Sequence, residues 1–223
     1  MSFELEEPTK FVTVSRAHFD DDLVKQASRQ ILDPSSGLWV RSEDIAKLGY
    51  DFFEEIPENP KHAPYIAFNL SKDLNLYRRM NEEFSAVTEV LRFMFSSVMS
   101  SSVLRELYDK AETPSDYDPT PIASFTINIC RPDQVVGRHR DWGDVSAARL
   151  ACIATLQGRG DFIVYDGEDG KDATTTTVKA GDLHLLFNPN SYQSRLEHEA
   201  TNTGDETRVS IGTQLRIPAH YLA

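Results

Sequence analysis

The sequence predicts an α+β protein whose strand-rich second half is covered on one side by helices from the first half. Two observations lead to this prediction. Apolar residues at helical spacing dominate positions 20–110, and short strand-like runs separated by turns fill positions 122–217. No linker separates the two parts. Residues 1–223 are therefore expected to form a single domain, with 1–121 as a mostly helical cover and 122–217 as a β-sandwich or barrel core.

Several segments of the first half are expected to be helical. Asp20 to Asp22 precede the run LVKQASRQIL and place acidic residues where a helix N-terminus favours them. Ser42 to Leu48 is typical of a short helix, and a longer one begins near Ser71 and keeps helical spacing to Phe95. The serine-rich run 97–103 would break or bend that helix. The run LRELYDKAE completes the helical region, and the proline-rich stretch 112–121 is expected to be a loop.

The second half is expected to contain eight short strands, since turn residues recur between its apolar runs. The expected strands are 123–130, 135–141, 148–156, 161–166, 174–178, 182–187, 192–198 and 207–216. Strands this short and this evenly spaced are typical of a sandwich or barrel.

The composition excludes some classes of protein. The chain has 223 residues, 40% of them hydrophobic and 12 of them Phe, which is enough for a sizeable core and unlike a disordered chain. The formal net charge of −12 would repel phosphate backbones, so nucleic acid is a disfavoured partner. The sequence gives no indication of the oligomeric state.

The cysteines and the N-terminus bear on location and metal chemistry. Cys130 and Cys152 lie in apolar runs and are expected to be buried thiols, too few to form a cysteine zinc site. The acidic N-terminus MSFELEEPTK lacks the apolar stretch of a signal peptide. No apolar run approaches the ~20 residues that span a bilayer. A cytoplasmic protein without a membrane partner is expected.

The stretch GRHRDWGD, residues 137–144, contains the first candidate ligands. His139 and Asp141 are two residues apart in a strand-like run, so they share one face. If that face is buried, both side chains need a partner. A metal ion would satisfy both, and a structural pair with Arg138 or Arg140 is the alternative.

The last expected strand carries a candidate anion site. Arg208, Ser210 and Gly212 share one face, and Val209 and Ile211 share the other. If the apolar face packs against the helices, the arginine and the hydroxyl point into the sandwich. A buried guanidinium is costly without an anion, and a carboxylate would supply one. A protein carboxylate remains the alternative partner.

These residues, in this order, resemble the Fe(II)/2-oxoglutarate-dependent dioxygenase superfamily. The pattern is a His-X-Asp pair, a distal histidine, and an arginine about ten residues later. The resemblance covers about residues 123–217 and implies a double-stranded β-helix core. It implies Fe(II) held by His139, Asp141 and His198 at the catalytic centre, and 2-oxoglutarate bound by Arg208 and Ser210.

Two further positions bear on the resemblance. In the related alkylation-damage demethylases, an N-X-Y segment helps to bind 2-oxoglutarate. Asn128 occupies the first position here and is a candidate cosubstrate contact, but Cys130 stands in place of the tyrosine. An asparagine bonded to the strand backbone is the alternative for Asn128.

The resemblance implies an oxidoreductase that hydroxylates a small molecule or an amino-acid-like substrate with dioxygen and releases succinate and CO2. Asp141 argues against a halogenase, because halogenases of this superfamily carry a small residue at that position. A nucleic-acid or nucleotide demethylase is a second hypothesis. A non-catalytic metal-binding β-sandwich module is a third. Desaturation, cyclisation and demethylation remain open as outcomes.

Several residues near the candidate site keep alternative interpretations. His198 could be an exposed strand end beside two glutamates, and His184 could replace it as a ligand, although no arginine follows His184 at the same spacing. We expect His184 to be a packed or interior-lining residue. Trp142 and Arg149 are close to the site in sequence, where an ordinary packing role is equally compatible with the pattern.

Overall fold

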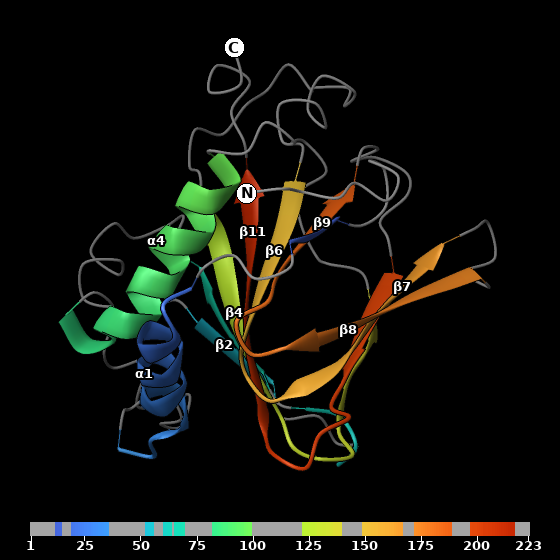
Figure 1. Cartoon of the computed structure of the whole chain (residues 1–223), viewed down its shortest axis with the longest axis horizontal. Coiled ribbons are helices and arrows are strands. Elements are labelled where there is room, and N and C mark those ends of the chain that lie inside the picture. The colour runs from blue at the N-terminus through green and yellow to red at the C-terminus, as the bar shows by residue number, and fades with distance from the viewer. Residues whose placement is uncertain are drawn as a thin grey trace.

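Two antiparallel sheets face each other, and the helices among the described residues cover the larger sheet (Figure 1). The computed structural model describes residues 12–14, 19–35, 52–55, 60–63, 65–69, 82–99, 122–139, 149–166, 172–188 and 197–216. Among these residues, no helix has the length and apolar character needed to cross a membrane.

The larger sheet has seven strands in the order β1-β9-β6-β11-β4-β3-β2. Its centre is β11 (Arg208–Arg216), which pairs with β4 (Ile122–Cys130) on one side and with β6 (Arg149–Gln157) on the other. The outer strands are β9 (Leu183–Asn188), β1 (Val12–Val14), β3 (Tyr65–Asn69) and β2 (Phe52–Glu55).

The smaller sheet has four strands in the order β5-β10-β7-β8. They are β5 (Val135–His139), β10 (Glu197–Thr201), β7 (Arg159–Asp166) and β8 (Asp172–Lys179). From β4 onward the chain crosses repeatedly between the sheets, with β4, β6, β9 and β11 in the larger sheet and β5, β7, β8 and β10 in the smaller. This arrangement is a jelly roll, and it confirms the predicted double-stranded β-helix core.

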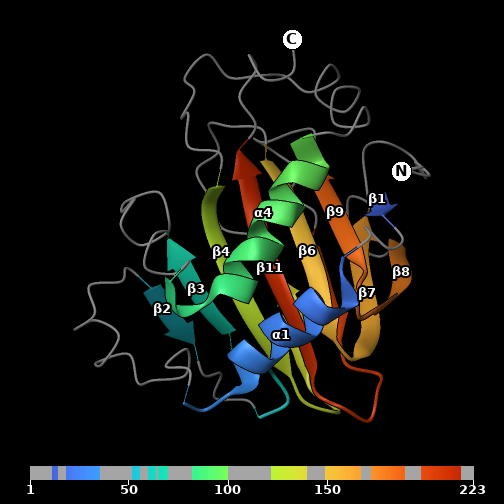
Figure 2. The ribbon, with the colours of Figure 1, turned by 60° about the vertical axis from the view of Figure 1, so that its left-hand side comes forward.

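Helices α1 (Asp21–Leu32) and α4 (Ser85–Met99) lie across the outer face of the larger sheet (Figure 2). Asp20 caps α1, because its carboxylate accepts a hydrogen bond of 2.8 Å from the Asp22 amide. The Gln30 side chain of α1 accepts hydrogen bonds from the amides of Ala86 and Val87 at the start of α4. These bonds satisfy helix-end donors and fix α4 against α1.

Where the structure describes the first half, it contains strands that the sequence pattern did not predict. It contributes three strands, β1, β2 and β3, of three, four and five residues. Strands this short contain too few residues to show a clear alternation. β1 pairs with β9 and β3 pairs with β4, both far along the chain, and β2 pairs with β3. The later part of the helix expected from Ser71 is found as α4 (Ser85–Met99), which ends within the serine-rich run, and residues 70–81 lie outside the described residues.

Other boundaries also differ from the expectation. The strand expected at 192–198 is β10, which begins at Glu197 and continues to Thr201. The segments expected as helix at Ser42 to Leu48 and at LRELYDKAE, and as loop at 112–121, lie outside the described residues.

Candidate active site between the two sheets

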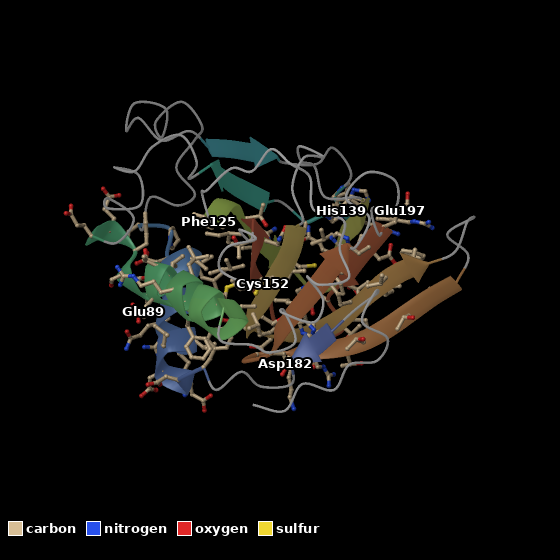
Figure 3. All side chains as sticks on the ribbon, turned by 90° about the horizontal axis from the view of Figure 1, so that it is seen from above. Glu89, Phe125, His139, Cys152, Asp182 and Glu197 are labelled. Carbon is tan, nitrogen blue, oxygen red and sulfur yellow. The ribbon has the colours of Figure 1, made fainter. Side chains whose placement is uncertain are left out.

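Two histidines meet at one end of the smaller sheet. His139 ends β5 and His198 is the second residue of β10, and the two are direct cross-strand partners. Their ring centroids are 4.4 Å apart, with the ring planes at 58°. His198 is only 4% exposed, which excludes the alternative of a solvent-exposed strand end. Figure 3 shows where His139 lies, with Glu197 beside it.

A β-bulge gives His139 its direction. Val136 pairs with Ala200 and His139 pairs with His198, so three residue steps on β5 match two on β10. Val136 packs against the interior cluster that includes Phe162. Without the bulge, residues three apart would point to opposite faces. With it, both Val136 and His139 can face the interior.

A hydrogen bond fixes which nitrogen of His139 carries the proton. Nδ1 of His139 lies 2.7 Å from the carbonyl oxygen of Gly137. A carbonyl oxygen only accepts hydrogen bonds, so Nδ1 donates and the lone pair is on Nε2. Metal-ligating histidines commonly have this arrangement, with one ring nitrogen held by a backbone carbonyl and the other facing the metal. The His139 environment therefore fits a metal ligand.

The third predicted ligand cannot be placed. Asp141 lies outside the described residues, as does Trp142, and nothing is described of the Arg149 side chain. Within the described part of the chain, no group of three His, Cys, Asp or Glu side chains is arranged to hold a metal ion. The metal role of His139, Asp141 and His198 therefore remains a prediction.

The interior face of the larger sheet carries the residues expected to bind an anion. Ser210 on β11 pairs with Asn128 on β4 and with Thr155 on β6. Thr155 is two residues from Ile153, which packs against the core cluster of the smaller sheet. This face therefore looks into the space between the sheets. Arg208 is two residues before Ser210 on the same face.

Arg208 is buried in this interior, with 1% of its surface exposed. Its Nη1 reaches the carbonyl oxygen of Thr201 on β10 at 3.5 Å, so its side chain spans from one sheet to the other. Gly160 on β7 leaves room for it, because a Cβ there would lie 3.1 Å from Cδ of Arg208. A Cβ at position 160 would first overlap the carbonyl oxygen of Thr201 and would also crowd the Arg208 side chain.

The described residues do not neutralise Arg208. None of them forms an ion pair with it within 4.0 Å, and its buried Nε finds no hydrogen-bond partner among them. Burial lowers the pKa of Arg208, while attraction to Cys130 and Asp161 opposes that shift. A guanidinium remains charged in proteins, so this side chain is a buried cation with unused donor capacity.

Thr155 was not recognised as a functional candidate from the sequence, and His184 was expected to be a packed or interior-lining residue. Thr155 is fully buried, and its hydroxyl has no hydrogen-bond partner among the described residues. His184 is also fully buried and stacks on Phe162, with ring centroids 6.2 Å apart. Burial, and to a smaller extent the charge of Arg208, lower the pKa of His184 to about 3. His184 is therefore neutral near pH 7, as expected for an interior-lining residue.

Cys130 and Asn128 complete this face. Burial raises the pKa of the Cys130 thiol to about 11, and the thiol donates to the carbonyl oxygen of Gln134 at 2.9 Å. Its hydrogen is thus committed away from Arg208. Asn128 is half-buried, on the same strand face as Cys130. Cys130 and Cys152 are both free and buried, which confirms the expectation for the two thiols.

Solved structures share this fold at low sequence identity. A prolyl hydroxylase from Trichoplax adhaerens, in complex with a hypoxia inducible factor oxygen degradation domain peptide, is 12% identical, with 93% of this chain and 84% of that chain covered and a TM-score of 0.52. A Pseudomonas putida prolyl-4-hydroxylase is 11% identical, with 94% of each chain covered and a TM-score of 0.47. At this identity, the Trichoplax structure supports the jelly-roll fold alone.

A Bacillus subtilis oxalate decarboxylase mutant is 12% identical, with 73% of this chain covered and a TM-score of 0.39. This chain spans 28% of the length of that decarboxylase chain. No protein-family model matches the chain, and no curated protein matches it either.

Proposed function

We propose that this protein is an Fe(II)- and 2-oxoglutarate-dependent dioxygenase that hydroxylates a small molecule or an amino-acid-like substrate. The observation that carries the proposal is the buried Arg208, which lies in the same interior as the His139–His198 pair and lacks an acidic partner among the described residues. A buried cation of this kind calls for an anionic ligand. The far carboxylate of 2-oxoglutarate would supply it.

Each residue of the proposed site has a role that follows from its chemistry. His139 and His198 would hold iron through imidazole nitrogens, and Asp141 would complete the set of ligands. Arg208 would bind the cosubstrate carboxylate, with Ser210 and Asn128 adding hydrogen bonds from the same face. Iron with 2-oxoglutarate and dioxygen would supply the oxidising chemistry, releasing succinate and CO2. Neutral His184 would line the pocket without adding a second positive charge.

The proposed partners are small molecules and dioxygen, in a cytoplasmic setting. The net charge of −12 continues to disfavour nucleic acid as a substrate.

The experiment is a titration of 2-oxoglutarate into the Fe(II)-loaded protein without oxygen, followed by the metal-to-ligand charge-transfer band. Arg208→Ala should weaken 2-oxoglutarate binding by about 2–5 kcal/mol, because a buried charge-assisted contact is lost. Arg208→Lys should restore part of the affinity, since an ammonium cannot make the paired contacts of a guanidinium.

Iron affinity is the internal control, because Arg208 is not among the proposed ligands. It should change much less than 2-oxoglutarate affinity in both variants. Equal 2-oxoglutarate affinity in Arg208→Ala and the wild type would show that this residue does not bind the cosubstrate.

A further inference from the structure

We propose that Arg138, Glu197, Tyr165 and Glu199 form an outer clamp on the solvent side of the smaller sheet that positions His139 opposite His198. The inference rests on the proposed function in one respect, that the two histidines are metal ligands. Arg138 directly precedes His139 on β5, and Glu197 directly precedes His198 on β10. The clamp therefore joins the two strands one residue away from the histidine pair.

The contacts of the outer clamp span three strands. Nε of Arg138 donates to Oε2 of Glu197 at 2.6 Å, and Nη2 of Arg138 forms an ion pair with the same oxygen. The guanidinium carbon of Arg138 lies 3.9 Å from the ring centroid of Tyr165 on β7. The Tyr165 hydroxyl is hydrogen-bonded to Glu199, and this bond raises the pKa of Tyr165. The Arg138 guanidinium therefore contacts both the Glu197 carboxylate and the face of the Tyr165 ring.

This part of the sheet needs a means of holding its register. The bulge between His198 and Ala200 interrupts the ladder of hydrogen bonds directly beside the histidine pair. Among the described strands, β5 has only β10 as a strand partner, with one further bridge between His62 and Val135. A slip of one residue would turn His139 to the opposite face. A contact between residues 138 and 197 opposes that slip at the point where the ladder is weakest.

The clamp is suited to positioning more than to stability. The side chains of Arg138 and Glu197 are 39% and 28% exposed. Ion pairs with this exposure contribute about 0–1 kcal/mol to the free energy of unfolding. Loss of the pair should therefore leave the protein folded and change mainly the geometry of the histidines.

The test compares Arg138→Met, Glu197→Gln and the double variant with the wild type, using Co(II) as the metal probe. Each single variant should bind Co(II) about 10–100-fold more weakly and change the visible Co(II) spectrum, as loss of an outer-shell partner does. The double variant should be no weaker than the worse single variant, because both substitutions remove one interaction. Arg92→Met is the matched control, since Arg92 forms an exposed ion pair with Glu89 on α4.

A second measurement does not depend on the metal. In NMR spectra of the metal-free protein, the ring signals of His139 and His198 should shift in Arg138→Met. The ring signals of His184 should not shift. Unchanged ring signals for the pair would overturn the clamp, whatever the metal result. If the ring signals move but the wild type binds no Co(II), the clamp stands and the proposed metal site fails.

Discussion

Both faces of the central strands β4, β6 and β11 carry buried residues, but the two faces are built from different residues. The face under the helices is apolar and includes Phe125, Ile127, Val209 and Ile211, each at most 1% exposed. Gln157 on this side bonds to Ser28 of α1, which shows where the helix packs. The face toward the smaller sheet carries Arg208, Ser210, Asn128, Thr155 and His184.

Burial has a different physical meaning on each face. On the helix side, buried surface is apolar and stabilises the protein by leaving water. On the interior side, two buried polar atoms have no hydrogen-bond partner among the described residues: Nε of Arg208 and Oγ1 of Thr155. Unsatisfied groups of this kind cost stability. Their position on one interior face is what a polar ligand between the sheets would require.

The largest effect on stability is expected on the helix side. Ile211→Ala should lower the free energy of unfolding by about 2–5 kcal/mol, because it removes a fully buried side chain and leaves a cavity. Chemical denaturation monitored by circular dichroism measures the change. Binding of 2-oxoglutarate by the folded fraction should be unaffected.

Ser210→Ala is the matched control, one residue away on the opposite face of β11. It removes a single hydroxyl, so its effect on unfolding should stay within about 1.5 kcal/mol. A cost for Ser210→Ala as large as that for Ile211→Ala would remove the distinction between the two faces.

An intermediate effect is expected from His184, as a loss of stability in acid. Its pKa is about 3 in the folded protein because the ring is buried, whereas an unfolded histidine has a pKa near 6.5. Below pH 6.5 the unfolded chain therefore binds the proton and the folded protein does not, so stability falls as the pH decreases toward 3. At pH 5 this amounts to about 2 kcal/mol.

His184→Phe should remove that part of the acid sensitivity while keeping a ring against Phe162. Unfolding free energies at pH 7 and pH 5 give the comparison. His62→Gln, at the edge of the smaller sheet, should leave the acid loss in place. An unchanged pH dependence in His184→Phe would mean that His184 is not held neutral by burial.

The sequence predicts the strand-rich core and helix α1, but it does not predict the three short strands of the first half. Strand alternation in RVSIGTQLR is sufficient to separate Arg208 and Ser210 from Val209 and Ile211, because a period of two is local to the strand. By contrast, β1 and β3 pair with strands far along the chain and β2 pairs with β3, and no local pattern reports these short strands.

The candidate site is predictable in the same uneven way. The family resemblance predicts that His139 and His198 lie together, and the structure pairs them. The segment VVGRH contains no residue that would have indicated the bulge that turns His139 inward. Thr155 could have been recognised, because it is a hydroxyl on the same face as Ile153 in a buried strand. The contact of Arg138 with Tyr165 joins strands far apart in sequence and required the structure.

The smallest effect, and the sharpest test of the comparison, is expected from Thr155→Val. Valine has nearly the shape of threonine without the hydroxyl. If that hydroxyl is buried without a partner in the ligand-free protein, replacing it should leave stability unchanged or raise it by about 1 kcal/mol.

In the liganded protein the Thr155 hydroxyl would bond to the anion beside Ser210, so 2-oxoglutarate should bind Thr155→Val more weakly, by about 0.5–1.5 kcal/mol. Thr155→Ser keeps the hydroxyl and should retain the affinity. Denaturation without ligand and 2-oxoglutarate titration, measured on the same variants, should therefore change in opposite directions. A clear loss of stability in ligand-free Thr155→Val would show instead that Thr155 belongs to the structural hydrogen bonding of the sheet, like any other buried hydroxyl.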